Sequence, residues 1–519
     1  MNSRWYVCCL AGLLASCADE PALTIIPVDG GLIEGVVDND LVVFKGIPFA
    51  APPVADLRWR DPQPVGSWDG VLVADSFAPA CMQEGVSMPG EPPPAISEDC
   101  LYLNIWTPAS RSGEALPVMV WIYGGGFSNG STALPLYAGN QLARRGVVVV
   151  SIAYRVGPFG LLAHPELTAE SPVKTSGNYG LMDQVFALQW IRDNVSEFGG
   201  DPNNVTVFGQ SAGATSISIL MASPQAKGLF HRAIGQSGGL FEPLQLAPNW
   251  LLRNAEQEGA EYALSLDVHS LGELRALPAE RLLEGKADSI AHPVIDSYFL
   301  PEIPFDVFAS GRQSAIPLIV GSNANEAGSL TNVEDVTAAN YVDEIAARWG
   351  PLPPPLIDAY TYTTDDEARR ARLDFERDLR FGWDARTWAR LHSLTGSPDV
   401  YSYYFTREPP FPAGTVYQGW GASHFAELWY VFGKLGQEPW DWQSADYELA
   451  ETMMSYWTNF ARTGNPNGPG LTHWPQYSDS QTVLNLDIPL TVIDAPNEGA
   501  LAIFDSVYST IRGETALPE

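Results

Sequence analysis

The segment that most constrains the fold is the pentapeptide GQSAG at residues 209–213, which directly follows the apolar run VTVF at 205–208. The apolar run predicts a strand, and the small residues after Ser211 are compatible with a helix. A sharp turn between a strand and a helix needs small flanking residues, which Gly209 and Gly213 provide. Such a turn holds a serine hydroxyl out at the end of a sheet. The segment therefore predicts a nucleophilic Ser211 in an α/β fold.

A second segment, GQSGG at 235–239, has the same Gly-x-Ser-x-Gly pattern. Its serine, Ser237, is followed by LFEP at 240–243, and the proline there makes a poor start for a helix. A strand–turn–helix context is the requirement for an exposed nucleophile. Ser211 rather than Ser237 is therefore the predicted nucleophile.

Several continuous apolar runs predict further strands, of which those at 118–123 and 147–152 are apolar enough to be buried on both faces of a sheet. Further runs stand at 316–320 and 400–405, and helical spacing over 182–195 precedes the strand at 205–208. Strands that alternate with helices are typical of the α/β class. We expect a large, mostly parallel central sheet flanked by helices.

Residues 330–395 are rich in helix-forming residues, and Gly382 is the only Gly or Pro between 365 and 394. No Gly/Ser-rich or Pro-rich linker separates this region from the rest of the chain. It is predicted to be a helical insertion packed on the sheet.

A serine hydroxyl is a poor nucleophile at neutral pH, so it needs a general base and an acid that orients the base. In α/β-hydrolases the acid and the base follow the serine in that order, each on a loop after a strand. Glu326 is the only carboxylate in GSNANEAG at 321–328, directly after a predicted strand. His424 lies in GASHFAE at 421–427, on the loop that follows the strand at 400–405. Glu326 and His424 are the predicted partners of Ser211.

The oxyanion of a tetrahedral intermediate needs hydrogen-bond donors. The strand at 118–123 runs into Gly124-Gly125-Gly126, where backbone N–H groups can point inward because no Cβ obstructs them. The N–H groups of Gly125, Gly126 and Ala212 are the predicted oxyanion hole.

The composition excludes some classes of partner. The chain has a formal net charge of −32, only 17% charged residues and five lysines. Such a surface repels phosphate backbones, so a nucleic-acid partner is not expected. The 45% hydrophobic content of 519 residues is enough for a large core.

The N-terminus has the features of an export signal. Arg4 precedes a short apolar stretch at 7–14, and LASC at 14–17 resembles a bacterial lipobox. We expect a signal peptide at 1–16, a lipidated Cys17 on a short tether at 17–22, and one hydrolase domain at 23–517. This predicts a periplasmic or cell-surface protein whose only membrane contact is the lipid at Cys17. The alternative is an ordinary signal peptide with a chance cysteine.

Five cysteines are present, and Cys8, Cys9 and Cys17 belong to the signal and its lipidation site. Cys81 and Cys100 then remain as a pair in an oxidising compartment. They form either a disulfide or two free buried thiols.

The chain resembles the type-B carboxylesterase family, which also contains cholinesterases. The matching segments occur in order over nearly all of residues 23–510, and they stand at 44–50, 98–105, 121–127, 178–184, 198–213, 321–328, 421–433 and 457–467. The resemblance implies an α/β-hydrolase fold with helical insertions near the active site. It also implies ester cleavage through an acyl-enzyme with a Ser–Glu–His triad and neither cofactor nor metal. The disulfide pattern of the family implies that Cys81 pairs with Cys100. The serine that matches Ser237 lies beside the triad acid in the family.

The chain departs from the family pattern at two places. The residue before the nucleophile is often Glu and is Gln210 here, a change not expected to affect chemistry. The loop at 82–99 contains no aromatic residue. Cholinesterases use a tryptophan there to bind choline by cation–π attraction, so choline esters are disfavoured as substrates.

Aromatic residues near the motifs are candidate walls of a substrate pocket, with core packing as the alternative for each. Phe425 stands where many relatives have a small residue beside the histidine. The candidates are Tyr123, Phe127, Trp420, Phe425 and Trp429.

Two other functions remain as alternatives. A catalytically inactive adhesion or binding module of this fold is expected to lack the serine, glutamate or histidine, and all three are present here. Amide or carbamate hydrolysis by the same machinery is a variant of the main hypothesis, which is hydrolysis of small or medium carboxylic esters.

Overall fold

The structure is a computed structural model that describes residues 23–85, 88, 92–397, 399–477 and 481–513. The predicted signal peptide at 1–16 and tether at 17–22 lie outside the described residues, as do the last four residues of the domain predicted at 23–517. Within the described ranges, no helix has the length and apolarity that a membrane span requires.

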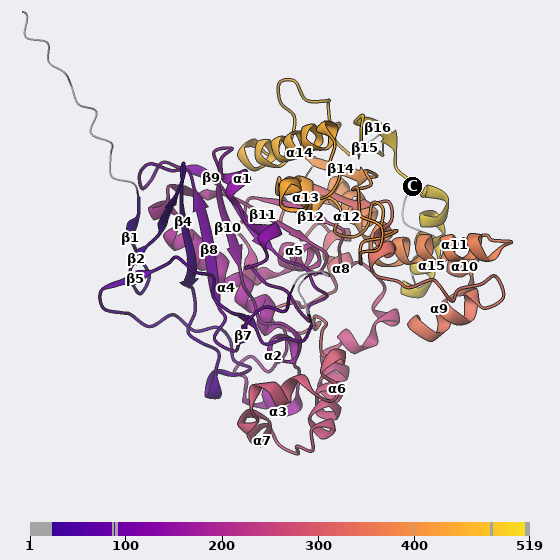
Figure 1. The fold of residues 1–519 in the computed structure, drawn as a ribbon. Coiled ribbons are helices and arrows are strands. Elements are labelled where there is room, and N and C mark those ends of the chain that lie inside the picture. The colour runs from indigo at the N-terminus through magenta and orange to yellow at the C-terminus, as the bar shows by residue number, and fades with distance from the viewer. Residues whose placement is uncertain (1–22, 86–87, 89–91, 398, 478–480, 514–519) are drawn as a thin grey trace, which may run out of the picture.

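A mixed sheet of eleven strands forms the centre of the described chain (Figure 1). Its order is β16-β15-β14-β13-β12-β11-β9-β10-β8-β4-β3. The pairings from β15 through to β10 are all parallel, and the pairings outside them are antiparallel. The expected α/β class with a mostly parallel central sheet is confirmed.

The strands of this sheet are β3 (Val36–Asp38), β4 (Leu41–Pro48), β8 (Tyr102–Thr107), β9 (Leu116–Ile122), β10 (Val148–Ile152), β11 (Gly200–Gln210), β12 (Arg232–Gln236), β13 (Leu318–Asn323), β14 (Val400–Phe405), β15 (Thr482–Leu486) and β16 (Thr491–Asp494). The residues at 118–122 and 148–152 are fully buried, as their unbroken apolar runs predict. The strand predicted at 316–320 begins later, at Leu318, because Pro317 has no N–H to donate to a neighbouring strand.

Helices cover the sheet. The helix α4 (Tyr179–Asn194) and the helix α5 (Ala212–Ala222) contact β11, α12 (Trp383–Thr395) contacts β13 and β14, and α14 (Ser444–Thr463) contacts β9 and β11. Shorter helices are α1 (Asn140–Ala143), α2 (Gly157–Leu161), α3 (Pro165–Glu170), α8 (Pro304–Ala309) and α13 (Leu428–Val431). The core is therefore shared between the sheet and the helices packed on it.

Smaller elements lie around this core. A three-stranded sheet of β1 (Ile25–Val28), β2 (Gly31–Glu34) and β5 (Val71–Val73) lies at the left of Figure 1, and β6 (Ala80–Cys81) pairs with β7 (Ile96–Ser97). The helices α6 (Leu252–Ser265) and α7 (Leu271–Ala276) extend at the bottom of the same view. The helices α9 (Tyr341–Trp349), α10 (Pro354–Asp358), α11 (Asp365–Arg377) and the C-terminal α15 (Glu498–Arg512) lie at the right of the same view, where α10 contacts α15 and α9 contacts α11.

The helical region expected over 365–394 is interrupted. A π-helical turn, η10 (Asp378–Gly382), separates α11 from α12. A Cβ at Gly382 would lie 2.7 Å from Oδ1 of Asp378, so glycine permits the close approach within this turn. Single π-helical turns inside α-helices occur frequently at functional sites.

Candidate active site

Ser211 occupies the sharp turn between β11 and α5. Its φ of 58° and ψ of −127° are values that a non-glycine residue rarely adopts. A Cβ on Gly213 would lie 2.0 Å from the carbonyl oxygen of Ile122, and one on Gly209 would lie 2.8 Å from the carbonyl carbon of Gly213. Both glycines are therefore required because strands and helix meet too closely for a side chain.

The second Gly-x-Ser-x-Gly segment packs directly against this turn. The N–H of Ser211 donates to the carbonyl of Gln236 at 2.8 Å, and the N–H of Ser237 donates to the carbonyl of Gly321 at 2.9 Å. Ser237 is fully buried, whereas Ser211 is only partly buried. No α-helix follows Ser237, since the next helical residues form a 3₁₀ turn at Leu244–Leu246. The geometry thus distinguishes the two serines.

Glu326 follows β13 and is fully buried. Its Oε1 accepts a hydrogen bond from the backbone N–H of Asn323 at 2.6 Å. Its Oε2 lies 2.6 Å from Nδ1 of His424. This bond fixes the Nδ1–H tautomer of the imidazole and leaves Nε2 to act as a base.

The loop that carries His424 is held by side chains from two other strands. The side-chain amide of Asn323 donates to the carbonyl of Ser423 at 2.6 Å. The side-chain amide of Gln210, the residue before Ser211, donates to the carbonyl of His424 at 2.6 Å. The sequence analysis assigned no role to Gln210, yet its amide links the backbone of the histidine to the turn that carries Ser211.

His424 is almost completely buried, at 1% exposure. Burial lowers the pKa of its imidazole; Glu326 opposes the shift and the Arg380 guanidinium adds to it. The ring of Phe381 packs against the imidazole with centroids 4.3 Å apart. Nε2 has no hydrogen-bond partner among the described residues, so the contact to the serine is not closed in this structure. Such contacts commonly tighten only when substrate binds.

The glycine-rich loop after β9 lies against Ser211. A Cβ on Gly124 would lie 2.8 Å from Cβ of Ser211. Gly125 and Gly126 have φ values of 110° and 60°, which favour glycine. Within the described chain, the N–H groups of Gly125, Gly126 and Ala212 donate no hydrogen bond. Three free donors close to one serine can bind an oxyanion.

Glu427 is a second buried carboxyl beside Glu326, and sequence analysis missed it. Its two oxygens accept hydrogen bonds from Nε2 of Gln236 at 3.0 Å and Nδ2 of Asn323 at 2.6 Å. Burial raises the pKa of Glu427 to about 8, and the neighbouring Glu326 adds to the rise. A largely protonated Glu427 avoids a second negative charge beside the acid. Its spacing of three residues from His424 was the one available signal.

A cavity of about 330 Å³ lies beside these groups. Thr215, one turn after Ser211, is in its wall, as is Phe381, which packs on His424. Its other walls include Phe127, Leu240, Trp349 and Arg380. It is the right size for part of a small organic molecule.

Of the five aromatic candidates, Phe127 lines this cavity. Tyr123 stacks on Tyr154 with ring centroids 4.5 Å apart and is buried in the core. Phe425 contacts the His424 ring at 5.0 Å. Trp420 and Trp429 pack in an aromatic cluster with Phe411, Tyr417 and Trp440.

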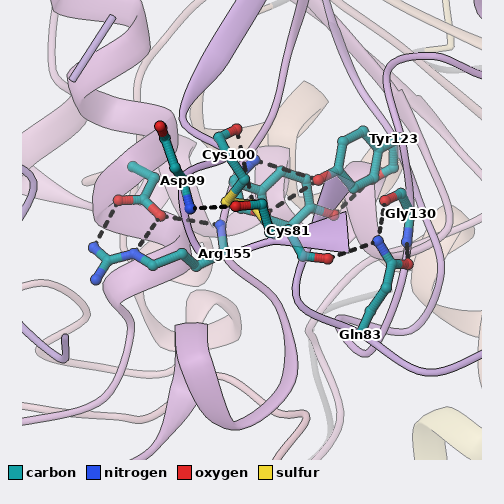
Figure 2. The surroundings of a disulfide bond; sticks show 10 residues. Cys81, Gln83, Asp99, Cys100, Tyr123, Gly130 and Arg155 are labelled. Carbon is teal, nitrogen blue, oxygen red and sulfur yellow. Dashed lines mark hydrogen bonds and ion pairs between the residues drawn. A yellow bond between two sulfur atoms is a disulfide. The ribbon is translucent and has the colours of Figure 1, made fainter. Parts of the chain in front are cut away.

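Cys81 and Cys100 form a disulfide (Figure 2). Gln83 lies next to it and joins the disulfide loop to the segment after the glycine-rich loop: its amide donates to the carbonyl of Gly130 at 2.8 Å and accepts from the N–H of Gly130 at 2.7 Å. Gln83 therefore links the disulfide loop to Gly130, just after the glycine-rich loop that begins at Gly124. Over the described residues, no group of three or more His, Cys, Asp or Glu residues is arranged to hold a metal ion.

Comparison with known proteins agrees with this geometry. A family model described as the carboxylesterase family matches residues 22–504. A fumonisin B1 esterase of Sphingopyxis macrogoltabida is 38% identical over 89% of this chain and 86% of its own length. A medium-chain fatty acyl-CoA hydrolase precursor of Anas platyrhynchos is 37% identical over 87% of this chain and 85% of its own length. Among solved structures, a PNB esterase has a TM-score of 0.80 and 33% identity, covering 93% of this chain and all of that chain.

Proposed function

The chain belongs to the carboxylesterase family and is a serine hydrolase that cleaves carboxylic esters, and from this premise we propose that Ser211, His424 and Glu326 are its nucleophile, base and acid. The observation that carries the proposal is the buried Glu326–His424 bond of 2.6 Å, whose histidine is linked by Gln210 to the turn of Ser211. Among the described residues, His292 also pairs with a carboxylate, that of Glu258. Only the pair of His424 and Glu326 is buried and linked to the turn of Ser211, whose φ is positive.

In the acylation step, Nε2 of His424 removes the hydroxyl proton of Ser211 while Oγ bonds to the ester carbonyl carbon. Glu326 stabilises the imidazolium through the Nδ1–H bond. The N–H groups of Gly125, Gly126 and Ala212 donate to the oxyanion. The tetrahedral intermediate then collapses, the bond to the alcohol oxygen breaks, and the imidazolium gives its proton to that oxygen.

In the deacylation step, water replaces the alcohol. His424 removes a proton from water as the water oxygen bonds to the acyl carbon, and it then gives that proton to Oγ of Ser211 as the bond between Oγ and the acyl carbon breaks. The products are an alcohol, a carboxylic acid and free enzyme. The mainly apolar cavity of about 330 Å³ supports esters of small or medium size.

The proposal is tested with Ser211→Ala and, as a matched control, Ser237→Ala. Loss of a triad serine costs on the order of 10⁶ in kcat, so Ser211→Ala should abolish ester turnover, whereas Ser237→Ala should retain substantial activity. An organophosphate should label the peptide that contains Ser211. Labelling of the peptide with Ser237, or turnover by Ser211→Ala, would contradict the assignment.

We also propose that the protein is exported and held at a membrane by lipid on Cys17. The support is the lipobox-like LASC at 14–17 and the disulfide between Cys81 and Cys100, which suits an oxidising compartment.

A further inference from the structure

Arg380 lines the cavity beside the active site without a hydrogen bond to the protein. Among the described residues it has no hydrogen-bond partner, and its Nη1 is buried. Its contacts are Phe381, with the guanidinium 5.1 Å from the ring centroid, and Trp349, at 5.8 Å. Two aromatic rings thus hold a guanidinium in place and leave its donors unused.

The carboxylate nearest to Arg380, that of Glu376, is shared with other side chains through Oε1, while the oxygen that faces Arg380, Oε2, accepts no hydrogen bond among the described residues. Glu376 lies 3.7 Å from Nη1 of Arg380, which is too far for a hydrogen bond. Its Oε1 lies 2.6 Å from Arg372 and 3.4 Å from Arg348, and it also accepts a bond from Nε1 of Trp349 at 2.9 Å. Three guanidinium groups therefore share one carboxylate. This cluster has an excess of positive charge in a protein whose formal net charge is −32.

The surroundings of Arg380 also disfavour the charged form of its guanidinium. Burial lowers the pKa of the Arg380 guanidinium, and Arg348 and Arg372 add to that shift, whereas Glu376 and Glu326 oppose it. An anion in the cavity would relieve this cost and use the free donors. The side chain is 28% exposed, so its remaining surface is accessible to a ligand.

The π-helical turn η10 brings this guanidinium close to the reacting groups. Arg380 and Phe381 are adjacent in that turn, and Phe381 packs on the imidazole of His424. Arg380 is also close enough to lower the pKa of His424. A group bound by Arg380 would therefore lie in the cavity beside Phe381, on the side of the molecule where Phe381 packs on His424.

The other charged groups in the cavity wall do not cancel this charge. His292 is bonded to Glu258 at 2.8 Å. Glu242 is partly buried, and loss of solvent around its carboxyl raises its pKa to about 7, so at mildly acidic pH the carboxyl is largely protonated and can donate to an anion.

We propose that this cavity is a subsite for an anionic group and that Arg380 determines specificity for esters whose acyl or alcohol part carries a carboxylate. The inference rests on the proposed function, since it places the carboxylate relative to Ser211 and His424. Arg380 binds the carboxylate by charge-assisted hydrogen bonds and takes no part in proton transfer.

The experiment compares matched esters by pH-stat titration at about pH 6, where Glu242 is protonated. For the acyl part, monoethyl glutarate is paired with its neutral isostere, ethyl 5-methylhexanoate. For the alcohol part, 4-acetoxybutyrate is paired with 4-methylpentyl acetate. The quantity measured is the kcat/KM of the anionic ester divided by that of its isostere.

In Arg380→Gln this ratio should fall by about 10- to 100-fold in one of the two pairs, and the pair identifies which part of the substrate carries the carboxylate. Arg380→Lys should keep most of the ratio because it keeps the charge. Arg348→Gln is the matched control, since it removes the same charge from the Glu376 cluster at a residue 49% exposed, and it should change the ratio by less than about twofold.

Hydrolysis of the neutral isosteres by Arg380→Gln shows that this variant folds. If the ratio is the same in the wild type and Arg380→Gln for both pairs while the isosteres are hydrolysed, the inference is overturned and the proposed function stands. If the wild type hydrolyses none of the four esters and an organophosphate leaves Ser211 unlabelled, the proposed function fails and the inference fails with it.

Discussion

The imidazole of His424 is subject to opposing influences that set its protonation at working pH. Burial favours the neutral form, Glu326 favours the charged form, and Arg380 favours the neutral form again. Burial is the largest influence, so the net shift of the pKa is downward. A base must be neutral to accept the serine proton, so the low pKa keeps His424 competent below neutral pH.

The expected result is a kcat/KM for a neutral ester that stays level from about pH 8 down to about pH 6.5, the ordinary pKa of histidine, and falls only below it. Arg380→Gln should move the midpoint of this fall to higher pH, because it removes a cation that repels the imidazolium. The measurement is initial rates across pH at substrate concentrations well below KM. A midpoint above about pH 7 would show that Glu326 outweighs burial.

The positions of Ser211, Glu326 and His424 on loops after strands could be predicted from the sequence because each loop follows a recognisable apolar run. The roles of Gln210 and Arg380 could not. The side-chain amide of Gln210 donates a hydrogen bond to a backbone carbonyl 214 residues away in the sequence. Arg380 was identified because, among the described residues, its guanidinium has no hydrogen-bond partner. Pairing over such distances leaves no local pattern.

At the scale of elements, the contact of α5 with β9 determines the position of Ser211, the proposed nucleophile. The helix begins directly after Ser211, and Gly213 faces the carbonyl of Ile122 at the end of β9. The sequence predicted both elements and the need for small residues between them. It did not specify that both glycines lie against the carbonyl oxygen of Ile122 at the end of β9.

Gly213→Ala should destabilise the protein by about 3 kcal/mol or more, because the new Cβ would lie 2.0 Å from a backbone carbonyl oxygen that cannot move away. The measurement is denaturant unfolding together with organophosphate labelling of Ser211. Gly272→Ala in α7 is the matched control, since nothing lies within 4 Å of that position. It should leave stability unchanged or raise it by up to about 1 kcal/mol. A stable, fully active Gly213→Ala protein would contradict the packing described.

The interruption of the helical region at 365–394 was not predicted because a π-helical turn keeps helical composition on both sides. The π-helical turn brings Gly382 close to Asp378. The carboxylate of Asp378 accepts hydrogen bonds from Tyr360 and Arg377. These contacts join segments of the insertion that only the fold brings together. The consequence for function is the placement of Arg380 and Phe381 beside the histidine.

At the scale of the whole molecule, the net charge is negative, whereas the charge of the arginine cluster around Glu376 is positive. The sequence gives −32 overall, which argues against nucleic-acid partners, but it does not show where the arginines gather. The cluster around Glu376 is a positive region within an acidic protein. Long-range repulsion is screened beyond roughly 10 Å at moderate salt, so this local charge can still bind an anion.

The last prediction concerns attachment of the whole molecule to a membrane through Cys17. Each buried acyl CH₂ contributes about 0.8 kcal/mol and stable attachment needs more than one chain, which a bacterial lipoprotein cysteine carries. An unlipidated acidic protein would instead be repelled by anionic headgroups. Wild type expressed in a bacterial host should therefore partition into detergent, whereas Cys17→Ser should stay in the aqueous phase without lipid. Wild-type protein that is soluble in the periplasm or medium and begins at Ala18 or later would exclude the anchor. Ester hydrolysis should be equal in both forms, because the proposed catalytic groups all lie in the described residues, after the predicted tether at 17–22.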